Sequence, residues 1–131
     1  MREELKKLLV NAYSPYYKFK VAAIVVTKDN KAFRGVNVEN ANGTSICAER
    51  NAIASAVSYG YRKGDFKEIY IMFDQNKLGT PCFACRQVLL EFFDNDSKII
   101  CMNYEEEKTY TLEELCPFPF GSDDLKWKVD L

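Results

Sequence analysis

Two short cysteine-bearing stretches, which must meet in space if they act together, constrain this sequence more than any other feature. They read Cys-Ala-Glu-Arg at residues 47–50 and Pro-Cys-Phe-Ala-Cys-Arg-Gln at residues 81–87. The chain contains no histidine, so a site for a soft metal ion has to be built from cysteine sulfur. The sequence therefore predicts a fold that brings these two segments side by side.

The spacing of the cysteines favours a metal site with one open position. Cys82 and Cys85 are three residues apart, and on a helix this spacing lets both sulfurs reach one ion. Cys47 is expected at the start of another helix, where partial positive charge favours thiolate over thiol. Three thiolates leave one tetrahedral position of Zn²⁺ free, as in a catalytic zinc site. Arg50, on the same helix face as Cys47, is expected to donate to the thiolates and to offset their charge.

The presence of Glu49 distinguishes a catalytic zinc site from a structural one. Zinc lowers the pKa of a bound water molecule, and a nearby carboxylate can take and relay its protons. Glu49 can serve in this way only if the metal lies beyond the amino end of the helix, where first-turn side chains converge. Two other interpretations remain open at this point. One is a structural Cys₄ zinc module completed by Cys101 or Cys116, and the other is a redox pair of Cys82 and Cys85.

The overall composition narrows the class of protein. A length of 131 residues fits a single domain, which we place at residues 1–131. The net charge is −1 and no run of lysine or arginine occurs, which argues against a nucleic-acid-binding module. Five cysteines without an apparent secretory or membrane-spanning segment argue against a disulfide framework. We therefore expect a soluble, cytoplasmic protein that binds neither nucleic acid nor membrane.

Hydrophobic periodicity predicts strands that alternate with helices after an opening hairpin. Thr80 is expected to cap the third helix, with Pro81 as its first residue. The expected elements are helices at about 5–12, 45–59, 81–93 and 111–115, a hairpin at 21–36, and strands at 69–73, 99–102 and 108–111. This order predicts a three-layer α/β/α fold, in which helices cover both faces of a mixed five-stranded sheet.

The combined motifs resemble those of the small cytidine deaminases whose zinc ligands are all cysteines. Besides the two cysteine stretches, the resemblance rests on residues 13–21, on Asn-Val-Glu-Asn-Ala at 37–41 and on residues 115–121. It covers nearly the whole chain in order. It implies a cytidine deaminase-like fold and the hydrolysis of cytidine and 2′-deoxycytidine to uridine and 2′-deoxyuridine with release of ammonia, a reaction of pyrimidine salvage. It also implies one zinc ion per subunit and a homotetramer.

The resemblance implies definite roles at the metal. Cys47, Cys82 and Cys85 bind zinc, and Arg50 lies against the ligands. Glu49 removes a proton from zinc-bound water and passes it to N3 of the cytosine ring while hydroxide attacks C4. Glu49 then helps to move a proton to the amino group, and ammonia leaves.

The resemblance also implies contacts to a free nucleoside. The backbone around Ala48 and the carbonyl of Thr80 hold the base, and the ring of Phe19 packs on it. Asn37 and Glu39 bind the ribose 3′-hydroxyl. Phe120 enters the pocket of a neighbouring subunit.

The sequence departs from the family pattern at three places. Phe83 stands where the family usually has glycine between the paired cysteines. Ala22 and Ile24 occur in a stretch that usually reads Val-Gly-Ala-Ala, and residues 42–44 replace a segment that often carries a tyrosine. These differences keep open a related zinc deaminase with another substrate, such as a nucleoside antibiotic, a free base or a base in RNA. The near-neutral charge argues against RNA.

Overall fold

A computed structural model describes the backbone of residues 1–128 and the side chains of residues 1–125. The predicted domain of residues 1–131 therefore extends beyond the described part at residues 129–131. The strands are β1 (Val21–Thr27), β2 (Ala32–Val36), β3 (Phe66–Phe73), β4 (Lys98–Met102) and β5 (Glu107–Thr111). The helices are α1 (Arg2–Leu9), α2 (Ala48–Ser58), α3 (Phe83–Phe92), α4 (Leu112–Leu115) and the 3₁₀ helix η1 (Ser122–Lys128).

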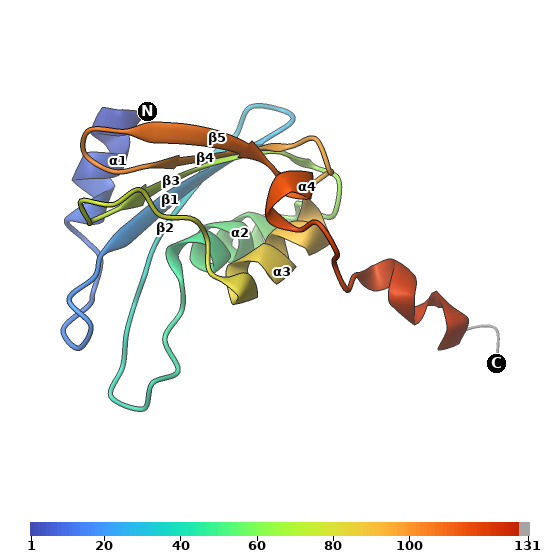
Figure 1. Cartoon of the computed structure of the whole chain (residues 1–131), viewed down its shortest axis with the longest axis horizontal. Helices are drawn as coiled ribbons and strands as arrows, with labels where there is room; N and C mark the ends of the chain where they lie inside the picture. The colour runs from blue at the N-terminus through green and yellow to red at the C-terminus, as the bar shows by residue number, and fades with distance from the viewer. Residues whose placement is uncertain (129–131) are drawn as a thin grey trace.

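The strands form one mixed sheet in the order β2-β1-β3-β4-β5 (Figure 1). β1 pairs antiparallel with both β2 and β3, and β4 pairs antiparallel with β5. β3 and β4 pair in parallel, so the chain must cross over between them, and α3 lies in that crossover. This arrangement confirms the predicted mixed five-stranded sheet.

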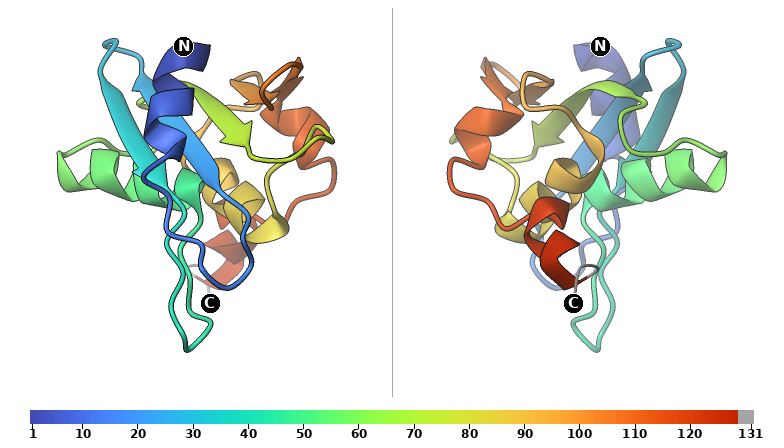
Figure 2. Two further views of the ribbon diagram at one scale, coloured as in Figure 1. Left: turned by 90° about the vertical axis from the view of Figure 1, so that its left-hand side faces the viewer. Right: turned by 90° about the vertical axis from the view of Figure 1, so that its right-hand side faces the viewer.

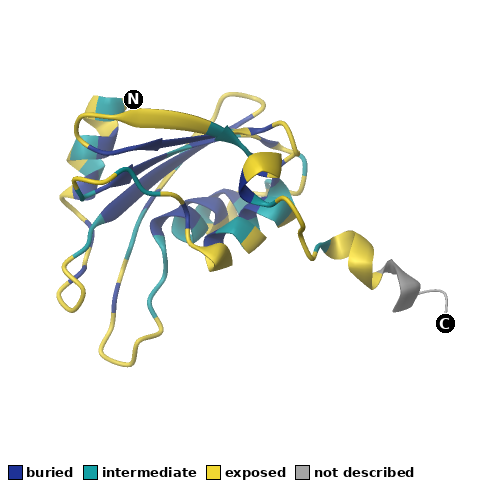
Figure 3. Ribbon diagram, viewed as in Figure 1, coloured by how far each residue is buried: buried dark blue, intermediate teal, exposed yellow. Residues whose placement is uncertain are grey.

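Helices cover both faces of the sheet, as Figures 2 and 3 show. Side chains alternate between the two faces along β1. Val21, Ala23 and Val25 join the core that α2 and α3 close, whereas Ala22 and Ile24 join the core under α1. The structure therefore confirms the predicted three layers.

Several predicted boundaries were wrong. α3 begins at Phe83 with Cys82 as its N-cap, not at Pro81 after Thr80. The physical reason is that the Cys82 sulfur itself accepts a hydrogen bond from the Cys85 amide, at 3.5 Å, and so replaces the predicted hydroxyl cap. α2 begins at Ala48 after the extended N-cap Cys47, three residues later than predicted. β3 begins earlier than predicted because its ladder with β1 continues to Phe66, and η1 was not predicted.

Gly35 lets α2 lie directly on β2. A Cβ atom at Gly35 would be 2.4 Å from the Ala52 backbone nitrogen and 2.6 Å from the Ala48 carbonyl oxygen. Because both atoms belong to the helix backbone, no side-chain adjustment could relieve the overlap. This contact sets the depth at which the amino end of α2 sits on the sheet.

Within the described residues, the helices are too short or too polar to cross a lipid bilayer.

Candidate metal centre

The three sulfurs of the two cysteine stretches converge where α2 and α3 begin. Cys47 is the N-cap of α2, Cys82 is the N-cap of α3, and Cys85 lies in the first turn of α3. Their Sγ atoms all lie within 4.8 Å of one another, and those of Cys47 and Cys82 are 3.8 Å apart. All five cysteines are free thiols, so Cys82 and Cys85 are not joined by a disulfide in this structure.

This geometry fits a tetrahedral zinc ion. Two sulfurs that each lie about 2.3 Å from zinc are about 3.8 Å apart, which matches the Cys47–Cys82 separation. The surrounding donors suit thiolates as well. The Arg50 Nη2 atom donates to Cys47 Sγ at 3.3 Å, and both helix amino ends point their partial positive charge at the sulfurs.

The thiols influence one another's ionisation strongly. Contact with Cys85, assisted by Arg50, lowers the pKa of Cys47 to about 5. The same contact and burial raise the pKa of Cys85. Like charges this close cannot all ionise without a cation between them, so the donor set is suited to a divalent ion.

Glu49 projects into the same site from the first turn of α2. Glu49 is only 3% exposed, and burial raises the pKa of its carboxyl group to about 7. Two residues that are two positions apart within a helix face different directions. Cys47 is the extended N-cap and not part of the helix, so this restriction does not keep its side chain away from that of Glu49. Both line one cavity together with Cys82.

That cavity has a volume of about 340 Å³, which suits a small molecule. It is bounded by the start of α2, the carboxyl end of β3 and the loop that leads to α3. Of the residues that the sequence assigned to substrate binding, four line it: Phe19, Asn37, Ala48 and Thr80. The structure thus gathers the two sulfur stretches and these four residues at one place.

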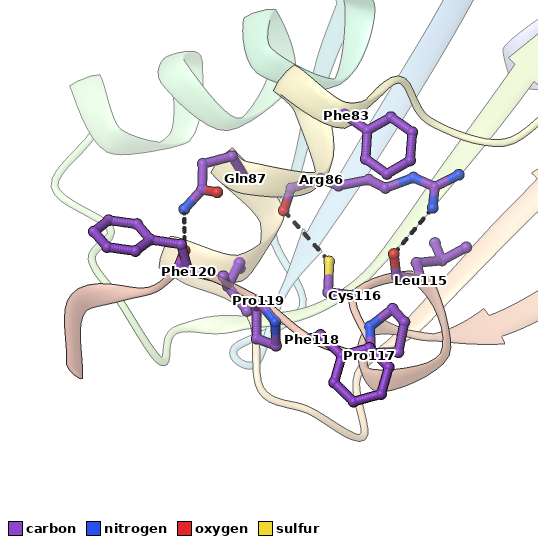
Figure 4. A pocket seen from close by; sticks show the side chains of 10 residues that line it. Phe83, Arg86, Gln87, Leu115, Cys116, Pro117, Phe118, Pro119 and Phe120 are labelled. Atoms are coloured by element: carbon purple, nitrogen blue, oxygen red, sulfur yellow. Dashed lines mark hydrogen bonds between the residues drawn. The ribbon is translucent and has the colours of Figure 1, made fainter. Parts of the chain in front are cut away.

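Two assigned residues do not line the cavity. Glu39 is 7% exposed, and its carboxylate accepts hydrogen bonds from the Ser14 hydroxyl and from the amides of Tyr16 and Tyr17. Phe120 is 60% exposed on the C-terminal segment. It borders a second cavity of about 300 Å³ between α3 and that segment (Figure 4).

The polar side chains of Asn37 and Ser14 hold Phe19 in place. The Asn37 amide accepts from the Val21 backbone amide at 2.8 Å and donates to the Phe19 carbonyl at 2.7 Å. The Ser14 hydroxyl accepts from the Phe19 amide at 3.0 Å, and the Phe19 ring stacks on Phe73 at 6.4 Å. Every backbone polar group of Phe19 therefore has a partner.

The sequence did not single out three residues that help to form the site. Ser14 lies within the residues 13–21 that carry the resemblance but was assigned no role of its own, although it bonds Glu39 and supports Phe19. Phe73 and Gln75 line the cavity at the carboxyl end of β3. Their location at the carboxyl end of a predicted strand could have identified them, because ligand sites in α/β sheets lie beyond the carboxyl ends of strands.

The departures from the family pattern lie away from the cavity walls. Phe83 is 80% exposed and borders the second cavity, so it does not narrow the first one within its own chain. Ala22 and Ile24 face α1 on the opposite side of the sheet. Residues 42–44 lie in an exposed loop that Asn40 holds by bonding Thr44.

Neither remaining cysteine joins the sulfur cluster. Cys101 is buried in β4, where burial raises its pKa to about 12. The Cys116 thiol donates to the Arg86 carbonyl at 3.8 Å instead. Among the described residues, the group that can hold a metal contains only three cysteines. This arrangement argues against a closed Cys₄ module.

The comparisons with known proteins agree with this geometry. Residues 1–103 match the family described as the cytidine and deoxycytidylate deaminase zinc-binding region. The chain is 39% identical over 115 residues to a cytidine deaminase of Mycoplasma genitalium, covering 86% of this chain and 87% of that protein. It is also 39% identical to a cytidine deaminase of Halalkalibacterium halodurans, with 87% and 86% covered.

Solved structures show the same likeness. The crystal structure of a cytidine deaminase from Burkholderia pseudomallei superposes with a TM-score of 0.86 at 38% identity, covering 90% of this chain and 94% of that one. A cytidine deaminase structure from Mycobacterium tuberculosis gives a TM-score of 0.76 at 27% identity, with 92% and 94% covered. The fold is therefore shared along most of the chain.

Proposed function

The chain belongs to the family of cytidine and deoxycytidylate deaminases, and on that premise we propose that it hydrolyses cytidine and 2′-deoxycytidine to uridine and 2′-deoxyuridine. Ammonia is the second product, and the reaction serves pyrimidine salvage. One observation carries the proposal: three cysteine sulfurs converge, and two of them, Cys47 and Cys82, line the same cavity as the buried Glu49.

Cys47, Cys82 and Cys85 would hold the zinc ion, one per subunit. Bound zinc lowers the pKa of a water molecule and so supplies a nucleophile at neutral pH. Arg50 and the amino ends of α2 and α3 stabilise the thiolate charge from the protein side.

Glu49 moves the protons of the reaction. A carboxylate oxygen of Glu49 takes a proton from the attacking water molecule and delivers it to N3 of the cytosine ring, while the water oxygen forms the new C–O bond at C4. The same carboxylate then carries the proton of the new 4-hydroxyl to the 4-amino nitrogen, so that the C4–N bond breaks, ammonia leaves and a carbonyl remains at C4. Its burial in the cavity supports this role, because bulk water does not compete for the proton there.

Residues around the cavity would hold the base. The backbone at Ala48 and the Thr80 carbonyl bind its polar edge, and the Phe19 ring packs on its face. The support for these contacts is that all three residues line the cavity that contains Glu49.

Asn37 and Glu39 would bind the ribose 3′-hydroxyl. A carboxylate offers about four acceptor directions, and the Glu39 carboxylate uses three of them for Ser14, Tyr16 and Tyr17. One direction remains for a hydroxyl donor. Among the described residues, the Asn37 side chain donates one hydrogen bond, to the Phe19 carbonyl, and accepts one from the Val21 amide, so one of its two N–H donors remains for a ligand.

We also propose that the chain works as a cytoplasmic homotetramer in which Phe120 reaches a neighbouring subunit's site. The support is the exposure of three phenylalanines around the second cavity: Phe83 at 80%, Phe118 at 97% and Phe120 at 60%. Exposed rings grouped in this way are typical of a surface that another protein covers.

Zinc-loaded protein incubated with cytidine and with 2′-deoxycytidine tests the proposed activity. We expect ammonia release from both nucleosides. Glu49→Gln should keep its zinc and lose about 10³- to 10⁴-fold in kcat, because the amide cannot accept and return a proton. Glu91→Gln, an exposed change on α3, is the matched control and should leave kcat unchanged. Zinc-loaded wild type that leaves both nucleosides intact would rule the proposal out.

A further inference from the structure

Arg86 of α3 lies between the candidate catalytic cavity and the C-terminal segment, and every nitrogen of its guanidinium group has a hydrogen-bond partner. Nε donates to the Pro81 carbonyl at 2.8 Å, and Nη2 donates to Thr80 Oγ1 at 2.9 Å. Nη1 donates to the Leu115 carbonyl at 3.0 Å (Figure 4). One side chain therefore joins the loop before α3 to the end of α4.

The ring of Phe83 covers this guanidinium group, with its centroid 4.6 Å from the Arg86 Cζ atom. A cation over a ring face is an attractive pairing, and the ring also limits the access of water to the hydrogen bonds beneath it. Phe83 stands between the two cysteines of α3, at the position where the sequence departs from the family's usual glycine.

Two further bonds join the same two segments. The Cys116 thiol donates to the Arg86 carbonyl at 3.8 Å, and Gln87 Nε2 donates to the Phe120 carbonyl at 2.8 Å (Figure 4). The C-terminal segment is thus attached along the first turns of α3 and does not only lie against them.

The loop that Arg86 holds needs outside support. Residues 78–82 belong to no helix or strand, yet Thr80 and Cys82 both line the catalytic cavity. Thr80 lines the cavity directly, so a shift of the backbone at Thr80 and Pro81 would move the cavity wall.

We propose that Arg86 is a positioning residue that clamps the Thr80–Cys82 wall of the active site onto the C-terminal segment at Leu115. The inference rests on the proposed function, because it concerns the wall that would bind the base. A lysine keeps the charge at this position but cannot reproduce three bonds in fixed directions from one planar group. The clamp therefore depends on the guanidinium shape and not only on its charge.

Steady-state kinetics of zinc-loaded Arg86→Lys and Arg86→Gln with cytidine test the proposal. We expect KM to rise about tenfold, with a smaller fall in kcat and an unchanged zinc content, because a displaced wall weakens binding in ground and transition states alike. Arg62→Lys is the matched control, since Arg62 also donates to backbone carbonyls, at Val57 and Tyr61, but on an exposed surface. It should leave KM unchanged.

A second readout does not need turnover. In Arg86→Lys we expect faster amide hydrogen exchange in residues 78–85 and 113–117, with exchange in β1 and β3 unchanged. This measurement separates the two proposals, because a wild-type protein inactive on cytidine would refute the function while the exchange data still test the clamp.

A double variant sharpens the comparison. Thr80→Val removes one acceptor of the Arg86 guanidinium. The KM increase of the double variant should therefore be smaller than the combined increases of Thr80→Val and Arg86→Lys measured separately. Wild-type values of KM and of exchange in Arg86→Lys would overturn the clamp. A loss of activity that merely follows loss of zinc, or an equal loss in Arg62→Lys, would overturn it as well.

Discussion

At the scale of single residues, the metal centre depends on charge that neighbouring groups supply. Three thiolates around Zn²⁺ leave one net negative charge, which weakens the ion as a Lewis acid. The Arg50 guanidinium opposes this charge from 3.3 Å, and its hydrogen bond to Cys47 raises the pKa of Arg50 further. The cation therefore stays protonated wherever the thiolates are ionised.

Single cysteine replacements should separate the ligands from the other thiols. We expect Cys82→Ala to lose zinc, because two sulfurs cannot retain the ion in competition with a chelator. Cys101→Ala and Cys116→Ala should keep one zinc per chain, since neither sulfur belongs to the cluster. Metal analysis after dialysis against a chelator provides the measurement. Zinc loss from Cys101→Ala or Cys116→Ala in a folded protein would revive the structural Cys₄ interpretation.

At the scale of elements, the site exists because the amino ends of two helices meet on one face of the sheet. α2 supplies Cys47 and Glu49, while α3 supplies Cys82 and Cys85. The sheet sets their distance, because α2 lies on the β1–β2 hairpin and α3 lies in the parallel β3–β4 crossover. Small shifts of either helix on the sheet would change the sulfur separations directly.

Gly35→Ala should test how closely α2 must approach β2. We expect a loss of about 3 kcal/mol in unfolding free energy, because the new Cβ would overlap the backbone of Ala48 and Ala52. Zinc affinity should fall too, since the helix that carries Cys47 must move. Urea denaturation and a zinc competition assay give the two values.

Gly121→Ala is the control for that comparison. Its Cβ would meet the Leu90 side chain at an ordinary 3.5 Å, so stability should change little. Equal midpoints for Gly35→Ala and wild type would show that the contact between α2 and β2 is not a constraint.

At the scale of the whole molecule, the two ends of the chain differ in how they are bound. α1 covers one face of the sheet and buries Leu5 and Leu9. The C-terminal segment extends past α4 (Figure 1), where Gln87 of α3 donates to the Phe120 carbonyl, and it leaves Phe118 almost fully exposed. Exposure of this kind favours an assembly in which other subunits cover the segment.

Assembly should be visible in sedimentation. We expect the wild type to sediment as a tetramer, and Phe120→Ala to raise KM for cytidine about tenfold at full zinc content, because a neighbour's site would lose an aromatic contact. Tyr59→Ala removes a similarly exposed ring at the far end of α2 and should leave KM unchanged. A monomer with full activity would contradict both the tetramer and the role of Phe120.

Much of the fold and of the site could be predicted because the signals were local. Alternating and helical periodicity identified the strands and helices, and the structure confirms their layering. The spacing of Cys82 and Cys85 predicts that both sulfurs bind one ion. A structural zinc site does not need a carboxylate two residues after its ligand Cys47. The catalytic function of Glu49 and the substrate contacts remain predictions.

The sequence carries no such signal for contacts between one residue and the backbone atoms of a distant segment. Arg86 finds the Leu115 carbonyl, Gly35 meets the backbone of α2, and Phe83 turns away from the cavity that its neighbour Cys82 lines. A carbonyl oxygen looks the same in every residue, so only the packing of the whole chain decides which one a side chain reaches. Residue identity and spacing determined which groups could bind the metal, whereas the tertiary structure decided what holds those groups in place.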